Sequence, residues 1–145
     1  MTSKFKLTII LTVIFLAIAF NDATAQNAKS TGFQDTLLNK FVYTYAEQLP
    51  EPKGGLESLV KLLTKSIRFP PGEADYGGRV IVAFVIEPNG KIDGERVIRE
   101  PSGNKQIFSK QIFEIVKTIK WKPARCNGKA VPFLYTLPIS IDISE

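Results

Sequence analysis

Few residues of this chain are suited to chemistry. The chain of 145 residues contains no histidine, the commonest general base and a common metal ligand. Asp93 and Glu95 stand two residues apart and would share one face of a regular strand, as a pair of acid–base carboxylates requires. Glycoside hydrolysis also needs a cleft between its carboxylates, whereas the neighbouring Gly94 and Arg96 indicate a solvated edge. We therefore predict that the protein is not an enzyme.

Two further features could hold a ligand or a partner. Cys126 is the only cysteine, so it is either half of a disulfide to another chain or, as we favour, an incidental small residue beside a turn. The pair Gly77–Gly78 could form a phosphate nest, but no G-x-G-x-x-G or P-loop motif accompanies it, which favours a plain turn. The sequence thus predicts no catalytic residue, no cofactor and no metal site.

The most informative stretch is residues 131–143, VPFLYTLPISIDI, which alternates like a half-buried strand and yet contains two prolines. Main-chain groups of successive strand residues point to alternate sides, so Pro132 and Pro138, six residues apart, lack donors on the same side. We therefore expect that side to be a free edge, where Leu134 and Thr136 offer donors and acceptors. The predicted partner-binding residues are Pro132, Leu134, Thr136, Pro138 and Ser140.

Other elements must position this strand. Residues 79–87 are apolar on both faces, which is typical of a central strand, and the turn at Asn89–Gly90 leads to a charged edge strand at 92–99. Apolar residues at helical spacing predict one helix on Leu56, Leu59, Val60, Leu63 and Ile67. The same spacing predicts a second helix on Phe108, Ile112, Ile115, Val116 and Ile119.

Smaller assignments complete this picture. Ser109 or Asn104 is expected to cap the second helix, and the sequence does not decide between them. We assign Phe69 and Trp121 to the core, because aromatic side chains usually serve packing, and Tyr135 to the buried face of its strand. The order helix, strand, strand, helix, strand predicts an α+β fold. Two helices would pack on one face of a three-stranded antiparallel sheet of order 2-1-3.

The N-terminus has the features of a secretory signal peptide. Lys4 and Lys6 precede an uncharged apolar run at residues 7–20, and Ala23-Thr24-Ala25 fits the small-residue cleavage rule. We expect cleavage after Ala25 and a periplasmic protein; the alternative is a retained inner-membrane anchor, although 14 apolar residues are short for a span. Residues 26–41 are expected to be a flexible lead-in. The net charge of +5 is spread among acidic residues, so no nucleic acid partner is expected.

Residues 42–143 resemble the C-terminal domain of TonB, the energy transducer of Gram-negative envelopes. The resemblance rests on GGLESLVKLL, GGRVIVAFVIEPNGKIDGERVI, FEIVKTIKWKPARCNGKAV and FLYTLPISI, in this order and spacing. Its recurring features are Gly54-Gly55, Phe69-Pro70, Asn89-Gly90, Trp121 with Pro123, Asn127-Gly128 and Leu137-Pro138. The resemblance implies that residues 42–145 form a TonB C-terminal-like domain.

What the resemblance implies is a binding role. Such domains grip a short N-terminal segment of outer-membrane transporters, which adds a strand to their sheet, a mode that agrees with the free edge predicted above. A full TonB has a retained anchor and a long spacer, whereas about 15 residues, reaching roughly 50 Å, separate Ala25 from the matching region. The alternatives are a short membrane-anchored transducer, with membrane contact only if the N-terminus is uncleaved, or a structural domain that forms a homodimer through its edge strand.

Overall fold

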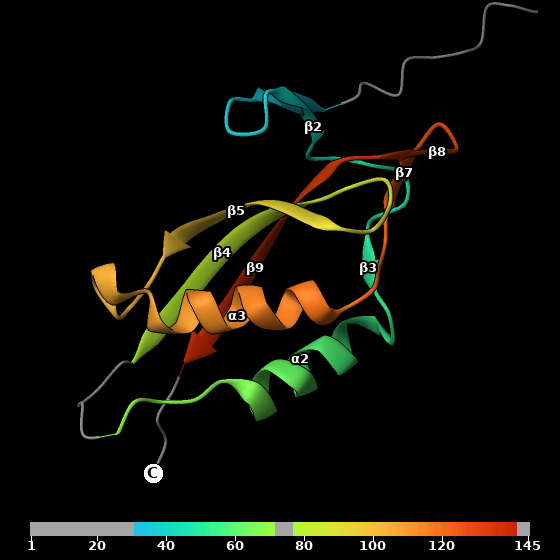
Figure 1. The fold of residues 1–145 in the computed structure, drawn as a ribbon. Coiled ribbons are helices and arrows are strands. Elements are labelled where there is room, and N and C mark those ends of the chain that lie inside the picture. Colours follow the sequence, from blue (N-terminus) through green and yellow to red (C-terminus); the bar gives the residue numbers. More distant parts are fainter. Residues whose placement is uncertain (1–30, 72–76, 142–145) are drawn as a thin grey trace, which may run out of the picture.

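A computed structural model describes residues 31–71 and 77–141 (Figure 1). The predicted signal peptide 1–25 and the first part of the lead-in lie outside the described residues. The strands are β1 (Gly32–Asp35), β2 (Lys40–Tyr43), β3 (Glu51–Pro52), β4 (Gly78–Ile86), β5 (Ile92–Arg99), β6 (Trp121–Lys122), β7 (Ala124–Cys126), β8 (Lys129–Val131) and β9 (Phe133–Ile141). The helices are α2 (Gly55–Ser66), α3 (Ile107–Thr118) and a short 3-10 turn, η1 (Gly103–Lys105).

The main sheet has five strands in the order β1-β2-β9-β4-β5. The predicted mixed α+β fold is confirmed, and β5, β4 and β9 stand in the predicted 2-1-3 order with both pairings antiparallel. The prediction of a three-stranded sheet is wrong, because the β1–β2 hairpin joins the far side of β9 and makes the sheet five-stranded. Two short ribbons, β3–β6 and β7–β8, complete the strands of the described residues.

The β1–β2 hairpin falls within the segment expected to be a flexible lead-in. Its turn is closed by Asp35, whose carboxylate accepts hydrogen bonds from the backbone N–H groups of Leu37 and Leu38, and by Asn39 in the left-handed region at φ 50°. The strands are only four residues long and mix polar with apolar residues, so their periodicity gives little signal. Residues 32–41 therefore belong to the folded domain, and the lead-in expected at 26–41 extends too far.

Both helices cover the same face of the sheet (Figure 1). Side chains on that face of β4, among them Val82 and Phe84, are fully buried and pack with Leu59 and Leu63 of α2 and with α3. Neither helix in the described part of the chain is long and apolar enough to cross a membrane. The predicted two-layer arrangement of helices on sheet is therefore present, with β4 as its buried centre.

The other face of β4 is buried too from Ala83 onward, as its apolar sequence there predicts. Arg96 of β5 lies opposite Ala83 of β4, so its side chain is on the face away from the helices. There it meets Asp35 of the β1–β2 hairpin, with 2.6 Å between Nη2 and Oδ2. The hairpin thus crosses this face, and Ala83 and Val85 are buried.

The N-terminus of α3 is capped by residues that precede it in the chain, and neither Ser109 nor Asn104 provides the cap. The Ser102 hydroxyl accepts a hydrogen bond from the Ile107 N–H at 2.9 Å. The Glu100 carboxylate accepts one from the Ser109 N–H at 2.8 Å and another from the Ser102 hydroxyl. A carboxylate at this end also interacts favourably with the helix dipole.

Candidate functional site

On one side, the main chain of β9 pairs with a neighbouring strand along its whole length. On the other side, it pairs only at its first residue. β4 pairs with β9 along the whole strand, from Gly78↔Ile141 to Ile86↔Phe133. On the opposite side, β2 reaches β9 only at Phe133, where the Tyr43 N–H donates to the Pro132 carbonyl at 2.9 Å. Main-chain groups alternate along a strand, so the even-numbered residues of β9 also direct theirs away from β4.

The five predicted edge residues therefore fall into two groups. The Pro132 carbonyl is already bonded to Tyr43, and Leu134 lies beside that bridge and is half-buried. Thr136, Pro138 and Ser140 are exposed, and on the side of β9 away from β4 no strand of the described residues lies next to them. The outward main-chain groups beyond the bridge are thus the N–H and C=O of Thr136 and Ser140 and the C=O of Pro138. The open stretch begins at Thr136, whereas the sequence suggested that it begins at Leu134.

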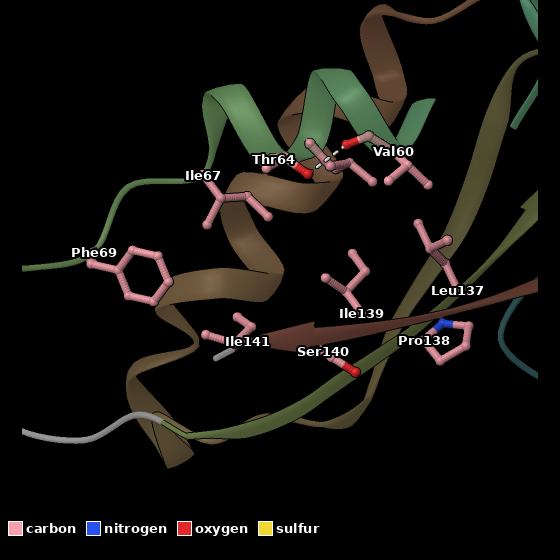
Figure 2. Close-up of a pocket in the computed structure, with 10 residues that line it drawn as sticks. Val60, Thr64, Ile67, Phe69, Leu137, Pro138, Ile139, Ser140 and Ile141 are labelled. Atoms are coloured by element: carbon pink, nitrogen blue, oxygen red, sulfur yellow. Dashed lines mark hydrogen bonds between the residues drawn. The ribbon is translucent and has the colours of Figure 1, made fainter. Parts of the chain in front are cut away.

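A groove runs along this open stretch, between β9 and the C-terminal half of α2 (Figure 2). Its volume is about 340 Å³. Leu137 and Ile139 point from β9 toward α2, while Pro138 and Ser140 point away from it (Figure 2). The wall on the other side consists of Val60, Leu63, Thr64, Ile67 and Phe69.

A second hollow of about 490 Å³ continues past the start of the open stretch. Leu134, Tyr135 and Thr136 of β9 form one side of it. The other side consists of Leu49, Pro50, Glu51, Pro52 and Leu56. Apolar side chains therefore border the open side of β9 from Leu134 to Ile141.

The wall of the groove exposes apolar side chains that the sequence assigned to the interior. Leu56 and Val60 belong to the apolar face of α2, yet they are 54% and 52% exposed. Phe69, predicted to be core, is 45% exposed, with one side of its ring against Phe108 at a centroid distance of 5.5 Å. The core takes up only Leu59 and Leu63 of α2, so Val60 lies over the groove and Leu56 over the second hollow.

The aromatic residues behind β9 form a fixed support. Trp121 is 5% exposed, as predicted for a core residue, and its indole N–H donates to the Val116 carbonyl at 3.1 Å. Its ring lies 5.2 Å from that of Tyr135 and 5.7 Å from that of Phe84, between ring centroids. Partial burial raises the pKa of the Tyr135 hydroxyl above its usual 10.0. β9 is therefore held firmly from its buried face.

The other candidate residues of the sequence do not assemble into a site. Glu95 accepts a hydrogen bond from Lys117 at 2.8 Å, which raises the pKa of Lys117, and the Asp93 carboxylate accepts the Gly94 N–H. Cys126 is buried in a small second core with Ala124 and Phe133. Among the described residues, no group of three His, Cys, Asp or Glu side chains is placed to hold a metal ion.

Comparison with known proteins shows similarity to a family and to solved structures. The family described as Gram-negative bacterial TonB protein C-terminal matches residues 72–142. Among solved structures, the chain is similar to the solution NMR structure of the Pseudomonas aeruginosa TonB C-terminal domain, at 19% identity and a TM-score of 0.39. That match covers 66% of this chain and 88% of the other. A search of curated proteins gave no match.

Proposed function

Since residues 72–142 belong to the TonB C-terminal family, which is linked to TonB-dependent transport, we propose that this domain grips an extended segment of an outer-membrane transporter. The segment adds a strand to the open side of β9, beginning at Thr136. The observation that carries the proposal is the coincidence of this open side with the apolar groove beside it. The family's domains are periplasmic, and we propose the same place for this chain, exported and cleaved after Ala25.

The main chain of β9 supplies the affinity in this proposal. A strand added at the usual spacing of about 4.8 Å accepts hydrogen bonds from the N–H groups of Thr136 and Ser140. Its own N–H groups donate to outward carbonyls of β9, among them the carbonyl of Pro138. Pro138 gives no N–H, so one carbonyl of the added strand lacks a donor. The contact is therefore short, and it depends on the side chains for the rest of its free energy.

The groove supplies the selectivity. Side chains of the added strand alternate between its two faces, so those level with Leu137 and Ile139 enter the groove and meet Val60. The neighbouring side chains lie level with Pro138 and Ser140, on the face away from α2. The groove thus favours a segment with apolar residues at every second position.

Replacing Thr136 tests this proposal. Thr136→Pro removes an outward donor, so it should weaken binding of a capped six-residue peptide, in which valine alternates with threonine, by about fivefold, as for one main-chain hydrogen bond of about 1 kcal/mol. Thr136→Val is the matched control, because it keeps the N–H and the shape of the side chain. Equal affinity of the two variants, measured by calorimetry on folded protein, would refute strand addition at this position.

The same open side could pair with a second copy of the chain. Sedimentation across a range of protein concentrations distinguishes the two uses. A monomer that binds the valine–threonine peptide supports the transporter contact. A concentration-dependent dimer that Thr136→Pro dissociates, with no affinity for the peptide, would replace it with a structural role.

A further inference from the structure

We propose that the β1–β2 hairpin is an end-stop that fixes how far a bound strand extends along β9, an inference that rests on the proposed function. The hairpin lies outside residues 72–142, the part of the chain that matches the family. It occupies the side of β9 that the added strand would use, but only at Phe133. A strand that begins level with Ile141 and continues past Thr136 therefore meets β2.

The hairpin blocks this end by a main-chain contact. The Tyr43 N–H donates to the Pro132 carbonyl. An added strand that runs along β9 past Thr136 and Leu134 would otherwise form its next hydrogen bond with this carbonyl. Tyr43↔Phe133 is the one register pair that joins β2 to β9 in the described residues. Backbone pairing alone holds the hairpin weakly, so its attachment depends on side chains.

Several of those side-chain contacts involve β5 and the end of β4. The carboxylate of Asp35, 1% exposed, accepts from Arg96 at 2.6 Å, and Lys40 forms an ion pair with Glu87 at the end of β4. Leu38 lies so close to Gly94 that an added Cβ there would come within 2.8 Å of Leu38 Cδ1. β5, at the opposite edge of the sheet, thus helps to hold the end-stop in its position on β9.

This arrangement predicts that loosening the β5 contacts lengthens the usable part of β9. Arg96→Met removes the cation and keeps an unbranched apolar stem, which leaves the Asp35 carboxylate buried without its partner charge. Gly94→Ala loosens the hairpin by a different route, through the clash with Leu38 at a φ of +60°. Lys122→Met is the matched control. It breaks the exposed ion pair between Lys122 and Glu51, which does not involve the hairpin.

Two measurements test the end-stop. Amide hydrogen exchange of Tyr43, without peptide, reports attachment of the hairpin and should be about tenfold faster in Arg96→Met than in Lys122→Met. Calorimetry then compares the valine–threonine peptide with versions extended by two residues at either end. The extension directed toward β2 should add little affinity in the unmodified protein and in Lys122→Met, and about fivefold in Arg96→Met and Gly94→Ala.

The outcomes separate the two proposals. An equal gain from both extensions in the unmodified protein would overturn the end-stop while leaving strand addition in place. A faster Tyr43 exchange in Arg96→Met with no gain from the longer peptides would also overturn it. If no peptide of any length binds any of the four proteins, strand addition fails, and the end-stop fails with it. Should Arg96→Met not fold, Gly94→Ala gives the same comparison.

Discussion

Truncation of Val60 measures how much the groove contributes to binding. The side chain is 52% exposed in the free protein, and a strand in the groove would cover it. Val60→Ala removes two methyl groups, worth about 1.6 kcal/mol if both were fully transferred from water, and binding covers about half of that. The expected loss is about 0.8 kcal/mol, or about fourfold in the dissociation constant of the valine–threonine peptide.

The same substitution should barely change the stability of the fold. Losing the half of the Val60 side chain that is already buried lowers the free energy of unfolding by about 0.8 kcal/mol. The higher helix propensity of alanine raises it again by up to about 0.7 kcal/mol. Leu62→Ala is the control, because Leu62 is 40% exposed on the same helix but does not line the groove. The affinity of both variants for the peptide is measured by calorimetric titration. Equal weakening in Leu62→Ala and Val60→Ala, or no weakening in either, would refute the role of the groove.

Two further predictions concern the scaffold. Glu100→Ala removes one of the two side chains that cap α3 and should lower the free energy of unfolding by about 1 kcal/mol, read from urea denaturation; an unchanged midpoint would mean that Ser102 suffices. Burial disfavours the charged form of Asp35, but the hydrogen bonds from Arg96 and the backbone outweigh this and lower the pKa of Asp35 below 3.8. Its contribution to hairpin attachment is therefore complete above pH 3.8 and lost as the pH falls through the lowered pKa. Amide exchange of Tyr43, corrected for its intrinsic pH dependence, should accelerate there, whereas exchange at Phe84 in β4 should not.

Local patterns in the sequence predicted most of the framework. The run from Arg79 and the Asn89–Gly90 turn specify a buried strand followed by a hairpin, and helical spacing specifies α2 and α3. These elements depend on neighbours a few residues away. The prolines of the last strand led us to expect a sheet edge, but β9 is the third strand of five, because β2 joins it at Phe133. Only from Thr136 onward does the side away from β4 lack a neighbouring strand in the described residues.

The features that the sequence did not reveal depend on distant contacts. β2 reaches β9 through Tyr43 and Pro132, which are far apart in the chain and carry no pattern that links them. Helical spacing shows that Leu56 and Val60 share a face, but not that the sheet is too narrow to cover that face. The side chains that cap α3, Ser102 and Glu100, precede it across a turn, beyond the positions where a cap is usually sought.

The central claim is that a bound segment becomes a strand next to β9. Amide exchange of Thr136 and Ser140, with and without a saturating concentration of the valine–threonine peptide, tests it most directly. Both N–H groups point away from β4, so strand addition predicts fast exchange in the free protein and strong protection in the complex. Peptide binding that leaves both amides exchanging as fast as before would contradict the account.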